Sequence, residues 1–416
     1  QVLYQLSYRG TGRCARLIAL SQRSCKPNIG SWVKKQNFGG DARHRSTAFS
    51  IGNKGYMGLG HINAISNILY EDIWEYDPAS NTWTQKANYG GGLNYHAACF
   101  VVDNIAYVGT GRILSGEYTT EFYRYDVGTN TWTAIANFPG TARRGAIAFA
   151  VGGKGYVGTG QTLAGVSKDF YEYDPAVDSW STVAQLPGAA RTSAVAFELN
   201  DKGYVGTGGS STWGNSLKDF WEYTPATNSW IQKANVGITP RMEATGFSVY
   251  GKGFIGTGDD QSSGTNYNDF WEYDPTTNTW VQIQDFFGMA RRYLVAFTIG
   301  NSAYVGLGTN GTNFKDFWEF DYLLSTIERD DELVQLKTYP NPATDYFTVD
   351  FSNIPEQMKS NSCEFQLFSA TGQLITSSAC ITNNLLVDVV RFKRGVYFYQ
   401  LVYNGASVKS GKIILN

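Results

Sequence analysis

Apolar and polar residues alternate in short segments along most of the chain, with turn-forming residues between them. One stretch reads RTSAVAFEL (191–199), KGYVGTG (202–208) and DFWEY (219–223), and a fourth segment begins at Trp230. Alternation with a period of two is typical of half-buried β-strands. Turn signals such as Asp77-Pro78 separate the third and fourth segments of an equivalent stretch. We therefore predict units of four short strands.

The second segment of this unit recurs six times, so an internal repeat dominates the sequence. The copies are GYMGLG (55–60), AYVGTG (106–111), GYVGTG (155–160), GYVGTG (203–208), GFIGTG (253–258) and AYVGLG (303–308). Their aromatic residues stand at positions 56, 107, 156, 204, 254 and 304, which is a period near 50. Four strands in such a period are typical of one blade of a β-propeller, and six copies predict six blades.

The fourth segment is missing from the last unit, which breaks off after DFWEFD (316–321). The other units carry a tryptophan at this place: Trp83, Trp132, Trp180, Trp230 and Trp280. Trp32 lies 51 residues before Trp83 and fits the same register. An open circular array would leave unpaired strand edges. We therefore expect residues 31–37 to pair with residues 316–321 and close the ring.

The GYVGTG block, the Tyr-Asp-Pro turn and the tryptophan seven residues after the tyrosine (Tyr273 to Trp280) resemble the kelch repeat. The likeness covers about residues 27–322, although the block has Gly-x-Gly where the typical kelch repeat has a Gly-Gly doublet. The resemblance implies a galactose-oxidase type propeller. The expected fold is all-β, a six-bladed kelch-like propeller closed by the N-terminal strand and followed by a small β-sandwich.

The periodicity stops after Tyr322. Residues 323–337 are polar and charged and are predicted to be a linker, whereas residues 338–416 are rich in strand-like segments. Two hairpins are expected, with turns near Thr371-Gly372 and Asn404-Gly405. Strands of this number suit a small immunoglobulin-like sandwich. The first 26 residues are left unassigned.

This C-terminal segment closely resembles the type A sorting domain of the bacterial type IX secretion system. The matching motifs are YPNP, FSATGQLI, RGVYFYQL and GKIIL, which include Tyr339, Pro340, Asn341, Pro342, Gly372, Gly395 and Lys412. The resemblance implies export across the outer membrane of a Gram-negative bacterium, followed by release or attachment at the cell surface. The alternative, an accessory immunoglobulin-like module, would leave the closing GKIIL unexplained.

Charge and composition narrow the possible partners. Thirty-four basic and 36 acidic residues nearly cancel, which argues against nucleic acid or an anionic membrane as a partner. No apolar run is long enough to form a transmembrane helix. The five cysteines form no CxxC pair, and the sequence leaves open whether Cys363 and Cys380 form a disulfide.

One cysteine has a structural explanation. A phenylalanine recurs in the first strand of every unit, and the residue before it is small: Ala48, Cys99, Ala148, Ala196, Gly246 and Ala296. Inner strands of a propeller crowd around its axis, so we expect these small residues to face the axis. Cys99 is then a packing residue and not a reactive thiol.

Catalytic and metal signals are weak. The chain has three histidines, His44, His61 and His96, and lacks the residue set for copper chemistry of the galactose-oxidase kind. Residues 259–269 are rich in oxygen ligands but do not match a calcium-loop spacing. We expect no metal and no cofactor.

Two recurrent charged positions are interpreted as structural. An arginine opens the first strand in five units, with Asn94 in its place in the other, and an acid opens the third strand in all six. These residues are Arg43, Arg143, Arg191, Arg241 and Arg291, and Asp72, Glu121, Asp169, Asp219, Asp269 and Asp316. Both positions fall at the same end of a blade. We expect ion pairs that hold the loops in place.

The candidate site consists of positions that are equivalent in all six repeats but carry a different residue in each. Two residues after the recurrent arginine stand Arg45, His96, Gly145, Ser193, Glu243 and Tyr293. After the second-strand GxG stand His61, Arg112, Gln161, Gly209, Asp259 and Thr309. The ligand-binding candidates are Arg45, His61, His96, Arg112, Glu243, Asp259 and Tyr293, whose mixed polarity suits a sugar or a peptide.

Two functions remain open at this point. The favoured one is a secreted or surface-attached binding or adhesion module for a glycan or protein ligand. The alternative is a secreted carbohydrate-active enzyme similar to the six-bladed kelch sialic-acid mutarotases, which work with arginine, histidine and glutamate in the channel. Convergence of a histidine, a glutamate and an arginine in one concave pocket would favour the enzyme.

Overall fold

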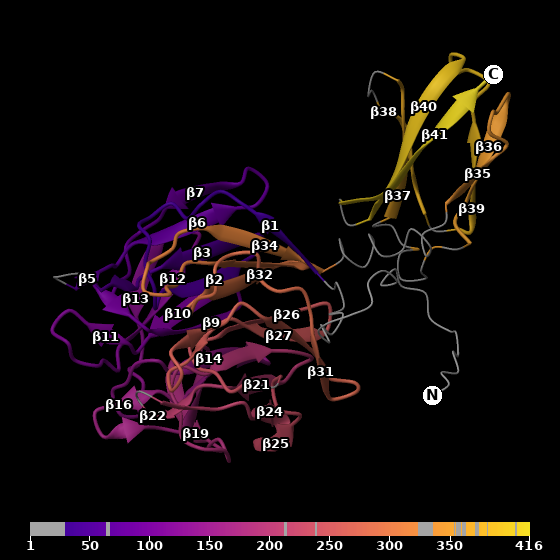
Figure 1. Ribbon diagram of the computed structural model, residues 1–416. Helices are drawn as coiled ribbons and strands as arrows, with labels where there is room; N and C mark the ends of the chain where they lie inside the picture. The colour runs from indigo at the N-terminus through magenta and orange to yellow at the C-terminus, as the bar shows by residue number, and fades with distance from the viewer. Residues whose placement is uncertain are drawn as a thin grey trace, which may run out of the picture.

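The computed structural model is built almost entirely of β-strands (Figure 1). It describes residues 30–416 apart from 64–66, 212–213, 238, 323–335, 353, 355–358, 360–362, 371–373, 381 and 404–405. The unassigned segment 1–26 therefore lies outside the described residues, and so does most of the expected linker 323–337. Lys337, the last residue of that linker, is instead the first residue of a strand.

The repeated part forms four-stranded antiparallel sheets, as the periodicity predicts. Five of them follow one another along the chain and contain β2 (Thr47–Ile51), β3 (Lys54–Gly58), β6 (Ile73–Asp77) and β7 (Thr82–Gln85); β9 (Ala98–Val102), β10 (Ile105–Gly109), β12 (Phe122–Asp126) and β13 (Thr131–Ala134); β14 (Ile147–Val151), β15 (Lys154–Gly158), β18 (Phe170–Asp174) and β19 (Ser179–Val183); β20 (Val195–Glu198), β21 (Gly203–Gly206), β24 (Phe220–Thr224) and β25 (Ser229–Lys233); and β26 (Thr245–Val249), β27 (Lys252–Gly256), β30 (Phe270–Asp274) and β31 (Thr279–Gln282).

Another such sheet combines the two ends of the repeated part. It contains β32 (Val295–Ile299), β33 (Ser302–Gly306), β34 (Phe317–Asp321) and, as its fourth strand, β1 (Ser31–Lys34). β1 pairs with β34 in antiparallel register, with Trp32 opposite Phe320. The pairing expected between residues 31–37 and 316–321 is therefore present.

The ring of Trp32 packs as those of the other fourth-strand tryptophans do, although its indole N–H, unlike theirs, has no hydrogen-bond partner. Its ring lies 4.9 Å from that of Phe270 in the preceding sheet, just as Trp230 lies 5.0 Å from Phe170. Trp32 is 3% exposed. Burial of such a large apolar side chain is among the strongest contributions a single residue makes to stability. β1 is thus packed as a full member of its sheet.

Neighbouring sheets interlock through the recurrent phenylalanine of the innermost strand. Its ring covers the first residue of the GYVGTG block in the following sheet, so that a Cβ added to Gly203 would lie 2.2 Å from Phe149. The same contact places Phe297, of the last repeat, against Gly55, of the first. The innermost strands contact one another in the order β2, β9, β14, β20, β26 and β32, and β32 contacts β2. Glycine or alanine is required here because the ring fills the space of a larger side chain.

The repeated turn after the third strand bonds five of the described sheets to the preceding fourth strand. Asn278 adopts a left-handed φ of 54°, and its side-chain oxygen accepts hydrogen bonds from the Tyr273 hydroxyl and from the backbone N–H of Ala234 in the preceding sheet. The indole N–H of Trp280 donates to the carbonyl of Ala234 at 2.9 Å. Asn81 and Trp83 make the equivalent bonds to Gln36, just after β1. These contacts explain why the chain repeats the phrase Tyr-Asp-Pro-x-x-Asn-x-Trp.

The expected arginine–carboxylate pairs are present in the five units that carry the arginine. Arg191 is fully buried and binds both oxygens of Asp219, at 2.8 and 2.6 Å, and the carbonyl oxygen of Thr207 at 3.0 Å. Where Asn94 replaces the arginine, its amide N–H donates to the equivalent carbonyl, that of Thr110, at 2.9 Å. Both partners are largely consumed by these bonds, which supports the structural interpretation of this ring.

Two differences from the expected unit lie at the end of each sheet where the recurrent arginine stands, which we call the mouth end. The first strand does not begin at the arginine: β20 starts at Val195, because Ser193 has a left-handed φ of 53° that interrupts the strand. Short two-stranded sheets also occur there. Four are hairpins: β4 (His61–Ile62) with β5 (Ile68–Leu69), β16 (Gln161–Thr162) with β17 (Gly165–Val166), β22 (Gly209–Ser211) with β23 (Gly214–Ser216), and β28 (Asp259–Asp260) with β29 (Thr265–Asn266). In the remaining one, β8 (Asn94–Tyr95) pairs with β11 (Arg112–Ile113) across the intervening β9 and β10. Figure 1 shows β5, β11, β16 and β22 at one end of the repeated part.

The C-terminal segment forms two sheets of its own. One contains β35 (Lys337–Tyr339), β36 (Tyr346–Asp350) and β39 (Asn384–Asp388), and the other contains β37 (Cys363–Phe368), β38 (Leu374–Ala379), β40 (Gly395–Tyr403) and β41 (Ala406–Leu415). Residues of both sheets share one buried core. The two expected hairpins are present as the pairs β37–β38 and β40–β41. Their turn residues lie outside the described part of the chain.

Removal of β1 tests whether its pairing with β34 matters for stability. Deletion of residues 1–38 should lower the melting temperature by roughly 10 °C, because the deletion removes the buried Trp32 and exposes the edge of β34. Deletion of residues 1–29 alone, which keeps β1, is the matched control and should leave the melting temperature unchanged. Equal melting of the two truncated chains in calorimetry would contradict this account.

Candidate functional site

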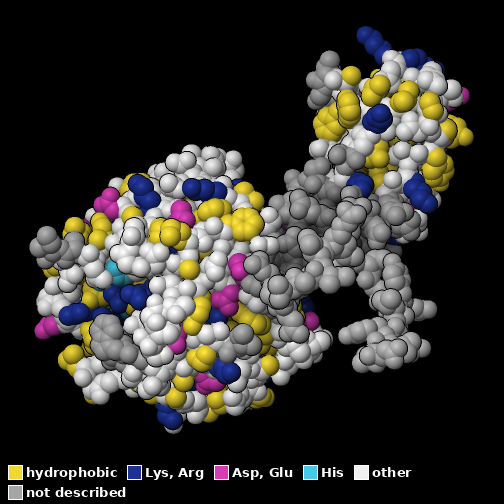
Figure 2. Space-filling model, viewed as in Figure 1, with side chains coloured by type: hydrophobic (Ala, Val, Ile, Leu, Met, Phe, Trp, Pro, Cys, Tyr) yellow, Lys and Arg dark blue, Asp and Glu magenta, His cyan; other side chains and the backbone are white. Residues whose placement is uncertain are grey.

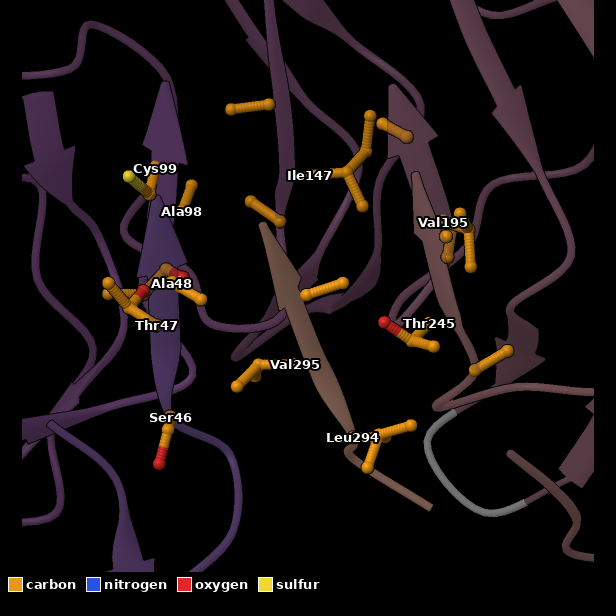
Figure 3. A pocket seen from close by; sticks show the side chains of 18 residues that line it. Ser46, Thr47, Ala48, Ala98, Cys99, Ile147, Val195, Thr245, Leu294 and Val295 are labelled. Carbon is orange, nitrogen blue, oxygen red and sulfur yellow. Dashed lines mark hydrogen bonds between the residues drawn. The ribbon is translucent and has the colours of Figure 1, made fainter. Parts of the chain in front are cut away.

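The innermost strands line a channel of about 210 Å³ (Figure 3). Its wall includes the small residues expected to face the axis, namely Ala48, Cys99, Ala148, Ala196, Gly246 and Ala296. In Figure 3 the labelled side chains of Ala48 and Cys99 lie on neighbouring strands of this wall. The pKa of the Cys99 thiol is raised by burial, so the thiol stays protonated and unreactive. This agrees with its interpretation as a packing residue.

One end of the channel is bounded by a backbone collar, which we define as Arg45, His96, Gly145, Ser193, Glu243 and Tyr293. All six adopt a left-handed φ between 53° and 62°. The N–H of each residue from His96 to Tyr293 donates to the carbonyl of the preceding collar residue at 2.8 to 3.0 Å. Non-glycine residues rarely adopt this conformation, and such strain is concentrated at functional sites. The collar places side chains from six distant repeats next to one another.

The residues that precede the collar pair with the residues that follow the GxG. His44 pairs with His61, Arg144 with Gln161, Met242 with Asp259, and Arg292 with Thr309. Tyr95 and Arg112 pair in the same way. The two sets of candidate positions are therefore brought to the same end of the channel, as the sequence predicts.

Arg45 lies at the centre of the site. Its guanidinium carbon lies 4.3 Å from the centre of the Tyr293 ring. One of its terminal nitrogens lies 2.8 Å from Nε2 of His61 and 3.3 Å from Nε2 of His44. Since a guanidinium only donates, these histidine nitrogens accept, and both rings must be neutral in this tautomer. Arg45 thus ties three aromatic side chains together.

The acidic half of the site lies opposite. The Tyr293 hydroxyl donates to Oε1 of Glu243. The second oxygen of Glu243 forms an ion pair with Arg292 at 3.3 Å, and Arg292 also pairs with Asp259 at 2.8 Å. Glu243, Asp259 and Tyr293 are all buried. A tyrosine hydroxyl and two charged pairs therefore converge below the collar.

Burial keeps the histidines neutral. It lowers the pKa of His44 to about 3, with the charge of Arg45 acting in the same direction. Burial lowers the pKa of His61 to about 2, and the pKa of His96 also falls well below its usual value. In each case the protonated ring would lose solvation and face at least one arginine. At neutral pH these rings act as hydrogen-bonding groups without charge.

Glu243 has the opposite shift. Burial, and then the charge of Asp259, raise the pKa of Glu243 to about 7, while Arg45 and the Tyr293 hydroxyl oppose the rise. Burial also raises the pKa of Asp259. A carboxyl group with a pKa near 7 can gain or lose a proton at neutral pH, which is the property of a general acid or base.

Four of the predicted ligand-binding residues line one small cavity at the collar: Arg45, His96, Glu243 and Tyr293. Its volume is about 10 Å³, which is room for about one water molecule. The cavity is too small to enclose a sugar or a peptide, and at its mouth Arg45, His96 and Arg144 are only half-buried. The other three predicted residues lie outside the lining of this cavity: His61 contacts Arg45, Asp259 contacts Arg292, and Arg112 donates to the Tyr95 hydroxyl.

Several buried polar atoms of the site have no hydrogen-bond partner: Nε of Arg45, Nδ1 of His61, Nδ1 of His96 and Oδ1 of Asp259. Such atoms are costly and are usually satisfied by water or a ligand. The arginines also outnumber the acids here. Figure 2 shows histidine and basic side chains close together on the side of the repeated part where β5, β11 and β16 lie.

The sequence misses part of the site. His44, Tyr95, Arg144 and Arg292 contribute contacts equal to those of the predicted residues. They occupy the position directly before the collar, which also varies from repeat to repeat. The collar residues were selected because they vary between repeats where the backbone is equivalent. The same criterion, applied to the position directly before the collar, would have found these four residues.

Comparisons with known proteins agree with this organisation. A family model for the kelch-repeat domain of KLHDC2, KLHL20 and DRC7 matches residues 91–252. A model for the secretion system C-terminal sorting domain matches residues 337–416. The chain thus carries a kelch-repeat region and a C-terminal secretion sorting domain. The search of curated proteins gave no match.

A solved structure shares the fold of the propeller. The structure titled "Structure of YjhT" superposes with a TM-score of 0.57, and the two sequences are 17% identical. The match covers 67% of this chain and 94% of that one. At this identity the likeness concerns the fold alone. None of the helices in the described part is long and apolar enough to cross a membrane.

Within the sorting domain, the structure joins two of the sequence motifs. The side-chain amide of Asn341 donates to the carbonyl of Lys412, and its oxygen accepts from the N–H of Ile414. YPNP and GKIIL are therefore held side by side. Gly395 begins β40 with a φ of 144°, whereas Gly372 lies outside the described residues.

The depressed pKa values can be measured because all three histidines of the chain lie in the site. In an NMR titration of the untagged protein, the ring C–H resonances of His44, His61 and His96 should not shift between pH 8 and pH 5. The protonated ring is disfavoured by burial and by Arg45. A resonance that titrates near pH 6.5 in the folded protein would show that the site is open to solvent.

Proposed function

We propose that the protein is an exported kelch propeller that binds a polar ligand, a glycan or a peptide, over the collar. The residues that contact the ligand at the cavity are Arg45, His96, Glu243 and Tyr293. His61 contacts Arg45, Asp259 contacts Arg292, and Arg112 stands at the same end of the channel, where it pairs with Tyr95. The partner is therefore a glycan or protein in the surroundings of the cell. The neutral overall charge supports neither nucleic acid nor a membrane surface as the ligand.

One observation carries this proposal. The collar backbone is the same in six repeats, yet its side chains are Arg, His, Gly, Ser, Glu and Tyr. Positions that serve only the packing of equivalent sheets keep the same residue, as the buried arginines do. Strained backbone, mixed polar side chains and unpartnered polar atoms at one mouth are the features of a binding site.

We further propose that the propeller has six blades and that β1 closes it. The contacts of β32 with β2 and of Phe297 with Gly55 support this closure. The proposed domains are residues 27–322 for the propeller, 323–337 for the linker and 338–416 for the sorting domain, with residues 1–26 unassigned. The match of the sorting-domain model from residue 337 supports the last boundary to within one residue.

The sorting domain implies export to the cell surface or the medium through the type IX secretion machinery. Its role in this chain can be tested by fusion. Residues 337–416 placed behind a reporter with an added signal peptide should bring the reporter to the surface or medium of a host with this machinery. A matched fusion that ends at residue 410, without GKIIL, should stay in the periplasm. Retention of both fusions in the periplasm would remove the export function.

Ligand binding can be tested with a glycan array and the isolated propeller, residues 27–322. For the glycans that the native propeller binds, the variant Arg45→Ala/His96→Ala/Glu243→Ala should have an affinity lower by at least about tenfold. The reason is that it lacks the charged and polar contacts at the mouth. The control is Asp77→Ala/Asp174→Ala/Asp274→Ala, at the turns of the opposite end. Equal loss in the control, or no loss in the collar variant, would refute this location.

A second function is favoured by a specific observation. Arg45, His96 and Glu243 line one cavity, and the pKa of Glu243 is about 7. This combination suits proton transfer on a sugar, such as the exchange of its anomers, with Glu243 as the group that takes and returns the proton. The enzyme alternative thus rests on Glu243, whereas simple binding does not require its pKa.

Exchange spectroscopy separates the two functions. If the protein is an enzyme, it should speed anomer exchange of a bound reducing sugar, and Glu243→Gln should abolish the acceleration while binding persists. The rate should rise with pH through about 7, because the carboxylate form of Glu243 must accept the proton. If a sugar that binds exchanges its anomers only at the spontaneous rate, the enzyme function is refuted and only the binding function remains.

A further inference from the structure

Two cysteines that are distant from the propeller site lie together in the core of the sorting domain. Cys363 begins β37, and Cys380 follows β38 directly. The backbone N–H of Cys380 donates to the carbonyl of Cys363 at 2.8 Å. The neighbouring pair Glu364 and Ala379 stand opposite each other in the β37–β38 ladder. The two cysteines are therefore the next directly opposed pair of that hairpin.

Their side chains point into the same core. Both cysteines are 0% exposed and belong to one cluster of buried residues. The two thiols hydrogen-bond to each other, which lowers the pKa of Cys363 and raises that of Cys380. The Cα atoms of directly opposed residues in an antiparallel pair are about 4.5 to 5.5 Å apart. A disulfide spans Cα distances of about 4.4 to 6.8 Å.

We propose that Cys363 and Cys380 form a disulfide in the exported protein. The inference rests on the proposed export, because disulfides persist outside the cytoplasm and are rare within it. The bond joins β37 to β38, at the end of the hairpin opposite its turn. It closes a loop across residues 363–380, which restricts the unfolded chain, and a buried bond is shielded from external thiols.

The chemistry is thiol–disulfide exchange with an external disulfide, either oxidised glutathione or the disulfide of an oxidoreductase. The thiolate of one cysteine attacks a sulfur of that disulfide and forms a mixed disulfide, and one external thiolate leaves. The second cysteine, as its thiolate, then displaces the other external thiolate. Two thiols of the protein are oxidised, the external disulfide is reduced to two thiols, and the two protons released from the cysteines protonate these products.

The bond can be mapped by mass spectrometry of the full chain. One tryptic peptide, residues 360–391, contains both cysteines, and cleavage after Glu364 separates them. Protein collected from the medium, unfolded and treated with iodoacetamide without reductant, should yield this peptide two hydrogens lighter and unalkylated. After additional cleavage at Glu364 the two fragments should remain linked. Cys99 is the internal control and should be alkylated, because its place in the channel wall offers no partner thiol among the described cysteines.

A second arm does not depend on export. The purified full chain is reduced, unfolded and refolded in a glutathione buffer, and the same peptide is examined. The linked peptide is expected in most molecules. The variant Cys363→Ala/Cys380→Ala should melt roughly 10 °C lower in its sorting-domain transition than the oxidised protein.

The outcomes of the two arms are distinct. Free thiols at both positions after refolding in oxidised glutathione would overturn the disulfide, whatever the route of export. A linked peptide after refolding, but no exported protein, would support the bond and refute the export function. Full alkylation of both cysteines in exported protein would overturn the proposal for the cell.

Discussion

The contact between neighbouring sheets is the interaction on which the rest of the structure depends. A four-stranded sheet of this kind has two faces to bury, and sheets that follow one another along the chain cover each other's faces. Phe149 over Gly203, and the bonds of Asn278 and Trp280 to Ala234, repeat this contact with the same geometry along the chain. Because the contact is always the same, the innermost strands gather around one channel and the mouth residues of all repeats meet at one end.

The arginines at this end of the sheets fall into two groups, which differ in what they contact. Arg191 and its equivalents bind both oxygens of a carboxylate and a carbonyl, so they have little capacity left for a ligand. Arg45, by contrast, faces the ring of Tyr293 and the neutral rings of His44 and His61. The buried Nε of Arg45, like that of Arg241, has no hydrogen-bond partner, and an unsatisfied buried donor costs stability. That cost is consistent with a site kept for binding or catalysis rather than for the fold.

The sequence predicts most of the fold because the repeat encodes it locally. The strands, the small residues that face the channel, the pairing of Trp32 with the last sheet and the arginine–carboxylate ring all follow from patterns with a period near 50. The left-handed collar does not, since Arg45, Glu243 and Tyr293 are poor signals for a positive φ. The pKa of Glu243 could not be predicted either, because it depends on burial and on Asp259, which only the folded chain brings close to it. The proximity of Cys363 and Cys380 depends on the register of one hairpin, which the sequence does not specify.

We propose that ligands bind at the collar, where the repeats differ, and not at the turns, where they agree. The decisive measurement is a crystal structure of residues 27–322 with the tightest glycan or peptide from a binding screen. Ligand atoms are expected within hydrogen-bond distance of Arg45, His96 and Glu243, with the collar backbone unchanged. Ligand bound among the Asp-Pro turns at the opposite end, or on the outer strands β7, β13 and β19, would contradict it.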